Sequence, residues 1–438
     1  MSTLEIGIWS FPALLALIFL RVPIGLAMFV VGFGGLYMVT GSPNMALARM
    51  KTEAYTTFSN YSLSIVPMFL LMGYFATLGG MSQALFRAAE GFLGHRKGGV
   101  AMAAIGSCAG FGAICGSSLA TAATMSRVAL PELRRYGYDG GFSTATLAAG
   151  GTLGILIPPS VVLVIYAILT EQNIAKLFVA AFVPGILAAL GYMIAVAIYV
   201  RVNPGSAGVR PPVAQAERWQ RLIAVWPVLL VFLLVVGGIY GGVFTPTEGA
   251  AVGALGTGLI AWANGGLTWK TALDSFADTA RSSAMIFFIV LGAGFYNGFL
   301  ALTRVPQELA DWVVNLGMAP VLVLVAILAL YLVFGCLMDS LSMILLTVPI
   351  FFPVISALDF GMSPEHVAIW FGILVLIVVE VGLITPPVGM NLFVINAMDR
   401  DTPITRTYRA VLYYVGSDLV RVAILVAFPA ITLFLVPG

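Results

Sequence analysis

The chain has 438 residues, of which 60% are hydrophobic and only 9% are charged, and its mean hydropathy is +1.03. Soluble domains carry about 25% charged residues, and in water this chain would expose more apolar surface than a soluble monomer tolerates. These values exclude a soluble enzyme, and 21 Lys+Arg against 19 Asp+Glu leave no basic field for nucleic acid.

The apolar runs are long and do not alternate with polar residues, as in 322–334 and 420–436. Helices that span a bilayer need about 20 apolar residues, whereas the strands of a membrane barrel alternate. We therefore expect an all-α membrane protein with about ten spanning helices. The predicted spans are, in chain order, 4–20, 23–41, 62–80, 143–170, 177–200, 222–242, 246–264, 282–302, 367–396 and 410–436.

Two further apolar segments, 98–130 and 320–356, are interrupted near their middles. The first is broken at Gly116-Ser117-Ser118 and the second at Asp339-Ser340. Each arm has about 14–18 residues, which is short for a full crossing. Non-helical backbone at membrane depth is tolerated only inside protein or beside a water-filled cavity. We favour two re-entrant hairpins; one overlong helix or two full spans are the alternatives for each segment.

The two halves of the chain share ordered sequence matches. GILIPP at 154–159 returns as GLITPP at 382–387, an offset of 228, and Pro131 matches Pro353 at an offset of 222. These matches predict a duplicated unit of span, hairpin and broken span. The predicted division is N-terminal scaffold helices (1–61), a first repeat (62–176), scaffold helices with a linker at 203–220 (177–281), a second repeat (282–398) and a C-terminal helix (399–438).

Charge predicts the orientation of the two repeats. The loops beside the first hairpin carry six basic residues, whereas those beside the second carry one, Arg304. The six are Arg87, Arg96, Lys97, Arg127, Arg134 and Arg135. Because basic loops stay in the cytoplasm, we expect the hairpins to enter from opposite faces. The repeats are then inverted, and both termini lie outside the cytoplasm.

Inverted repeats with broken helices are typical of secondary transporters, whose site lies near the midplane. A helix broken inside the membrane offers N–H groups that favour anions and carbonyls that favour cations. We expect the first break to face 150–159 and the second to face 380–387. The candidate cation ligands are Gly116, Ser117, Ser118, Gly151, Thr152, Gly154, Asp339, Ser340, Glu380, Gly382 and Thr385. The candidate substrate-binding residues are Ser117, Ser118, Pro158, Pro159, Thr385, Pro386 and Asn391.

Two acids interrupt apolar runs in the second half, where a charge costs at least a few kcal/mol. Asp339 lies at a helix break, and we favour it as a cation ligand or proton carrier. Glu380 is either a cation ligand or a buried acid that fixes the broken helix through backbone N–H groups. Asn391 either faces substrate or bonds between helices. No nucleotide-binding loop or metalloprotease motif is present, so we expect neither an enzyme nor a bound cofactor.

Taken together, the strings at 151–160 and 382–391, Met338-Asp339 and Gly116-Ser117-Ser118 resemble the large membrane subunit of tripartite ATP-independent periplasmic (TRAP) transporters. Cys115 departs from the resemblance, since a serine or similar small residue is expected there. The resemblance implies an unfused large subunit in the bacterial inner membrane and an elevator mechanism driven by Na+. It also implies a small four-helix membrane subunit, a periplasmic substrate-binding protein, and an organic acid such as a C4-dicarboxylate or sialic acid as substrate.

Three other functions remain open from the sequence. A stand-alone carrier of the same superfamily would share the two hairpins and work without partners. An intramembrane enzyme would use Asp339 and Glu380 as an acid pair, although the two acids belong to different elements. A channel is the third, and saturable uptake coupled to an ion gradient would exclude it.

Overall fold

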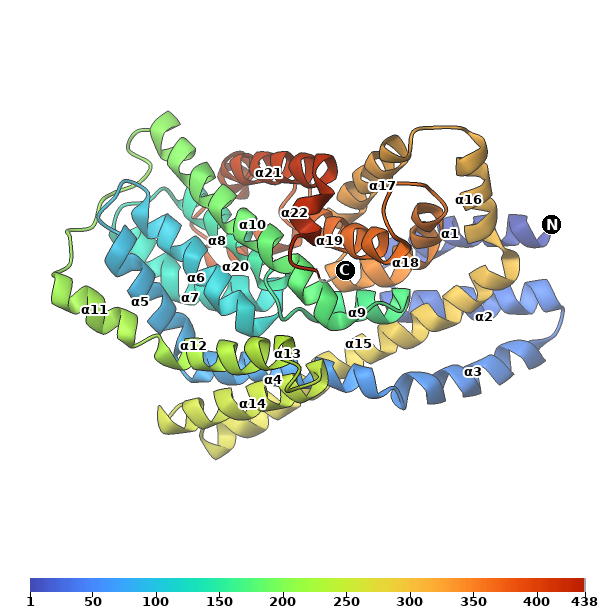
Figure 1. Cartoon of the computed structure of the whole chain (residues 1–438), viewed down its shortest axis with the longest axis horizontal. Coiled ribbons are helices and arrows are strands. Elements are labelled where there is room, and N and C mark those ends of the chain that lie inside the picture. Colours follow the sequence, from blue (N-terminus) through green and yellow to red (C-terminus); the bar gives the residue numbers. More distant parts are fainter. Residues whose placement is uncertain (437–438) are drawn as a thin grey trace.

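The computed structural model describes residues 1–436, which form helices and no β-strand (Figure 1). In the first half the helices are α1 (Thr3–Phe19), α2 (Ile24–Thr40), α3 (Pro43–Phe58), η1 (Tyr61–Ser64), α4 (Ile65–Leu78), α5 (Met81–Leu93), α6 (Gly99–Cys115), α7 (Ser118–Arg135), α8 (Gly140–Leu156), α9 (Val161–Thr170) and α10 (Ile174–Val202). The second half has α11 (Gln215–Ile223), α12 (Trp226–Phe232), η2 (Leu233–Gly237), α13 (Gly238–Tyr240), α14 (Pro246–Ala263), α15 (Trp269–Thr303), α16 (Val305–Asn315), α17 (Pro320–Gly335), α18 (Ser340–Ser356), α19 (Pro364–Gly382), α20 (Met390–Met398), α21 (Ile404–Ala427) and α22 (Pro429–Leu433). The expected all-α class is confirmed.

Helix length separates full spans from shorter apolar helices. Within residues 1–436, six helices are long and apolar enough to cross a bilayer, or seven if α8 and α9, bent by 44° at their break, form one span. Five further apolar helices have 10–17 residues, and they include α6, α17 and α18 of the two interrupted segments. The short arms fit the reading of these segments as hairpins, which stays a prediction about their place in the membrane.

The backbone breaks lie where glycine, serine and proline interrupt the apolar runs. Gly116 follows α6 with a φ of +63°, in the left-handed region that glycine adopts most easily, and Ser117 caps α7. Prolines lack the N–H that a continuous helix needs, and α8 ends just before the cis Pro158-Pro159 pair. The cis Pro386-Pro387 pair lies in the matching gap between α19 and α20.

Several predicted boundaries are wrong. A Thr268 cap starts α15 at Trp269, and no proline interrupts the helix before 303, so the predicted boundary at 281/282 falls inside it. Pro131 lies within α7, so the first hairpin extends beyond its predicted end at 130 as far as Arg135. The linker is extended only as far as 214, since α11 begins at Gln215, and the C-terminal helix is divided at Phe428.

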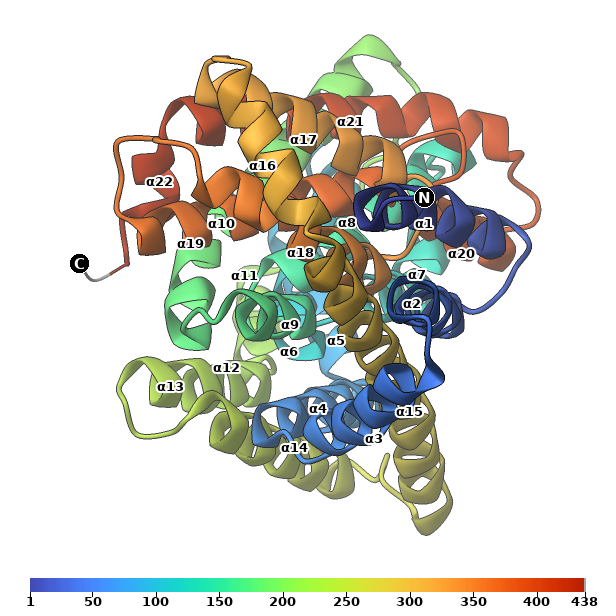
Figure 2. The ribbon, with the colours of Figure 1, turned by 90° about the vertical axis from the view of Figure 1, so that its right-hand side faces the viewer.

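The broken helices of the two halves form the centre of the molecule. Residues 141–156 of α8 and 367–382 of α19 are buried along their whole length. Figure 2 shows α4, α12, α13 and α14 gathered on one side, with α17, α19 and α21 on the other. The long α15 runs between these groups and packs closely on α2, where an added Cβ at Gly32 would lie 3.0 Å from the backbone of Tyr296.

Ion pairs join the ends of elements from different halves. Arg134, near the end of α7, pairs with Asp399 and Asp401 in the turn after α20. The linker folds back on α5, where the buried Glu90 lies 2.6 Å from Arg210. These contacts hold the first hairpin against the end of the second broken helix, and the linker against the helix that precedes the first hairpin.

Candidate functional site

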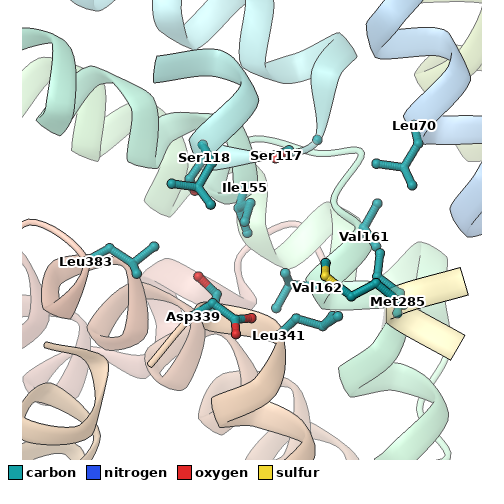
Figure 3. A pocket seen from close by; sticks show the side chains of 14 residues that line it. Leu70, Ser117, Ser118, Ile155, Val161, Val162, Met285, Asp339, Leu341 and Leu383 are labelled. Carbon is teal, nitrogen blue, oxygen red and sulfur yellow. The ribbon is translucent and has the colours of Figure 1, made fainter. Parts of the chain in front are cut away.

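A cavity of about 130 Å³ lies where the two interrupted segments meet (Figure 3). We name residues 116–118 the first tip and residues 336–340 the second tip. The polar lining consists of Gly116, Ser117 and Ser118 from the first tip and Asp339 and Ser340 from the second. The apolar lining is Leu70, Leu119, Ile155, Val161, Val162, Met285, Ile286, Leu341 and Leu383. The two tips lie 222 residues apart in sequence and share this one cavity.

At the first tip, a helix begins at the cavity. Ser117 accepts a hydrogen bond from the Ala120 N–H at 3.4 Å and thereby caps α7. The first N–H groups of α7 therefore lie near the cavity. An added Cβ at Gly116 would lie 3.0 Å from the Pro159 carbonyl, so the tip packs directly on the Pro-Pro break. The predicted contact between the first tip and the 150–159 segment is present.

At the second tip, a carboxylate takes the place of the serine cap. Asp339 accepts from the Ser342 N–H at 3.0 Å and also from the Ser342 hydroxyl. Its side chain is half-buried and faces the cavity across from Ser117 and Ser118 (Figure 3). Two hydrogen bonds leave free acceptor positions on this carboxylate, so Asp339 supplies negative charge and ligand oxygens to the cavity.

Glu380 joins the two tips. It is 1% exposed in α19, and its Oε1 accepts the Ser340 hydroxyl at 2.6 Å while its Oε2 accepts the Ser118 hydroxyl. Of the two roles left open for Glu380, the one in which it fixes its own broken helix through backbone N–H groups is therefore wrong. Its partners are side chains of the two hairpins, because the last turn of α19 lies between them.

Glycines allow each hairpin to approach its broken helix. An added Cβ at Gly112 in α6 would lie 2.5 Å from the Cα of Gly154, and one at Gly335 in α17 would lie 3.0 Å from the Cα of Gly382. The carbonyl oxygen of Ser117 would lie 2.8 Å from a Cβ at Gly154. Any larger residue would push the hairpin away from the helix break, so these positions require glycine.

Several candidate residues lie away from the cavity. Thr152 donates to the Ala149 carbonyl at 2.7 Å and its hydroxyl lies 3.0 Å from that of Tyr192, on the far side of α8 from the tips. Asn391 donates to the Ala148 carbonyl at 3.2 Å and thus bonds between helices. The remaining candidates outside the lining are Gly151, Gly154, Pro158, Pro159, Glu380, Gly382, Thr385 and Pro386.

A buried ion pair in α21 was not predicted from the sequence. Asp418 and Arg421 are 1% and 6% exposed, and their charged atoms lie 2.7 Å apart. Tyr192 donates to Asp418 at 2.6 Å, which extends a chain of polar contacts from Arg421 to Thr152. The signal was an acid and a base three residues apart inside an apolar run, a spacing that places both on one helix face.

No group of three or more His, Cys, Asp or Glu side chains within residues 1–436 is placed to hold a metal ion. The oxygens at the tips are hydroxyls, backbone carbonyls and single carboxylates, which suit a hard cation better than a soft one. Helix N-termini at both tips favour a negative group in the same cavity.

Broken helices from two halves that meet around a central cavity define the architecture of a secondary transporter. Residues 11–431 match the family model described as "Tripartite ATP-independent periplasmic transporter, DctM component". The chain belongs to this family, as the large membrane subunit of a TRAP transporter.

Two curated relatives support this assignment. The chain is 36% identical to the C4-dicarboxylate TRAP transporter large permease protein DctM of Pseudomonas aeruginosa, over 92% of each chain. It is 30% identical to the sialic acid TRAP transporter large permease protein SiaM of Vibrio cholerae, over 96% of each. Among solved structures, the YdaH transporter of Alcanivorax borkumensis has a similar fold, with a TM-score of 0.62, 16% identity and 90% coverage of both chains.

Proposed function

We propose that this large permease subunit is a cation-coupled symporter, driven by Na+, that imports an organic acid. The observation that carries the proposal is the single cavity in which two helix N-termini and the Asp339 carboxylate meet. The N-termini attract the carboxylate of a substrate, whereas Asp339 repels it. A cation bound at Asp339 removes this repulsion, so cation and anion bind together.

The cation sites are proposed at the two tips. The first consists of Gly116, Ser117 and Ser118 with the facing backbone at Gly151 and Gly154. The second consists of Asp339 and Ser340 with the backbone around 382–385. Na+ prefers oxygen ligands and needs more of them than the Asp339 carboxylate alone provides. The hydroxyls and carbonyls at the tips supply these further ligands. The organic anion lies between the tips, and the relatives that transport C4-dicarboxylates and sialic acid support a carboxylate substrate.

The tripartite family supports two protein partners, a small four-helix membrane subunit and a periplasmic substrate-binding protein. In this proposal the chain lies in the bacterial inner membrane with both termini periplasmic. The hairpins and broken helices move as one body against the scaffold, carrying the cavity across the membrane in an elevator motion. The ion pairs of Arg134 with Asp399 and Asp401 fit such a body, because they join its two halves.

Reconstitution into sealed vesicles tests the proposal. With the small subunit, the binding protein and an inward Na+ gradient, we expect saturable uptake of a C4-dicarboxylate that stops when the gradient is removed. A proton gradient that replaces Na+ fully would overturn Na+ coupling. Full uptake by this chain alone would instead favour the stand-alone carrier, and uptake that never saturates would favour a channel.

A further inference from the structure

Ser118 and Ser340, the two serines that donate to Glu380, occupy matching positions in the two hairpins. Ser118 is the first residue of α7, directly after its cap Ser117, and Ser340 is the first residue of α18, directly after its cap Asp339. Ser340 follows Ser118 by 222 residues, and Asp339 follows Ser117 by the same number. The same offset relates Pro131 to Pro353. Glu380 therefore connects equivalent points of the two tips.

Glu380 itself has no acidic counterpart in the first half. The offset of 228 between the two Pro-Pro motifs places Thr152 at the matching position of α8. The Thr152 hydroxyl bonds to Tyr192 and not to either tip. One carboxylate thus serves both hairpins, with one oxygen for each.

The burial of this carboxylate makes the connection stiff. The two hydrogen bonds lie away from water, and a low dielectric strengthens them because no solvent competes for either partner. Glu380 is 1% exposed, so a tip that moves away leaves a buried carboxylate oxygen without its donor. The cost of that loss links the position of one tip to the position of the other.

We propose that Glu380 is a positioning residue that couples the two tips, so that a cation bound at one tip raises the affinity of the other for a second cation. The inference rests on the proposed cation coupling and adds cooperativity to it. Coupling between two sites is reciprocal, so either tip can bind first. Glu380 acts through Ser118 and Ser340 and holds both hydroxyls in place.

Glu380→Asp is the sharpest variant, because it keeps the carboxyl group but is one methylene too short to reach both serines. In purified protein, the unfolding temperature is measured against Na+ concentration. We expect the Hill coefficient to fall from above 1 to about 1, and the half-saturating Na+ concentration to rise about tenfold. Ser118→Ala and Ser340→Ala each remove one half of the connection and lower the Hill coefficient in the same way.

Matched controls remove buried hydroxyls that bond only within one hairpin. Ser126 in α7 donates to the Ala122 carbonyl, and Thr347 in α18 donates to the Met343 carbonyl while its hydroxyl lies 2.8 Å from that of Tyr331. Ser126→Ala and Thr347→Val lower the unfolding temperature but keep the Hill coefficient. A general loss of packing would instead lower the Hill coefficient in the controls as well.

A double-mutant cycle without Na+ separates the two proposals. If Glu380 couples the tips, the drops in unfolding temperature caused by Ser118→Ala and Ser340→Ala are not additive in the double variant. Additive drops overturn the coupling, as does a Hill coefficient of 1 in the unaltered protein or one that survives Glu380→Asp. A protein that does not respond to Na+ at all overturns the proposed Na+ coupling, while the cycle still decides the role of Glu380.

Discussion

In the first half of the molecule the cap at the hairpin tip is the neutral Ser117, and in the second half it is Asp339. The backbone around the two caps is alike: each hairpin crosses its broken helix through a pair of glycines, and each broken helix has a Pro-Pro pair. The polar side chains differ, since Thr152 in α8 matches Glu380 in α19. The two tips thus share these backbone features, while the acidic side chains Asp339 and Glu380 both come from the second half.

We expect the largest difference between the two halves for variants of the two caps, Ser117 and Asp339. Asp339→Asn removes the charge but keeps an oxygen that accepts from the Ser342 N–H, so we expect a folded protein without Na+-dependent uptake. Ser117→Ala removes a cap worth about 1 kcal/mol and should retain measurable uptake. Uptake in vesicles at varied Na+ distinguishes the two variants. Equal losses would show that the charge at the second tip has no special role.

The Asp418–Arg421 ion pair, which Tyr192 connects to Thr152, should affect stability strongly and have no direct role in binding. Arg421→Met leaves Asp418 buried without its partner, which costs about 3–5 kcal/mol. The double variant Asp418→Asn, Arg421→Met removes both charges and should regain much of this loss. Chemical denaturation of the purified protein measures both changes. A small loss of stability in the single variant Arg421→Met would indicate that water reaches Asp418.

The two glycine contacts also differ between the halves, because Gly112 approaches its broken helix more closely than Gly335 approaches its own. We expect Gly112→Ala to cost about 2–3 kcal/mol and Gly335→Ala about 1 kcal/mol, in the range for overpacked contacts. Gly34→Ala is the control, since no atom lies within 4 Å of a Cβ there, and alanine in a helix stabilises by about 1 kcal/mol. Thermal unfolding ranks the three variants, and a reversed order of the two crossings would contradict the geometry.

Thr152→Val predicts the smallest change. Valine has nearly the shape of threonine but lacks the hydroxyl that contacts Tyr192, which keeps its bond to Asp418. We expect a loss of about 1 kcal/mol in stability and an unchanged Na+ dependence of uptake. A changed Na+ dependence would return Thr152 to the cation site.

The sequence predicted the breaks and their pairing because glycine, proline and small polar residues interrupt apolar helices in a recognisable way. It did not predict the partners of Glu380, since Ser118 lies 262 residues away and helical periodicity says nothing about such contacts. The Asp418–Arg421 pair was missed because its three-residue spacing places both charges on one helix face but does not show that this face of α21 is buried. The boundary at 281/282 was placed inside α15 because charged residues interrupt the apolar pattern in the first turns of that helix without ending the helix.

The contact between Ser118 and Glu380 also bears on how the protein is made. A ribosome adds about 5–20 residues per second, so the 262 residues between them take on the order of 13–50 s to synthesise. During that time the first tip exists without the acid that joins it to the second. The contact between the two tips through Glu380 therefore waits for the second half of the chain, and a truncated product that ends before residue 380 would lack it.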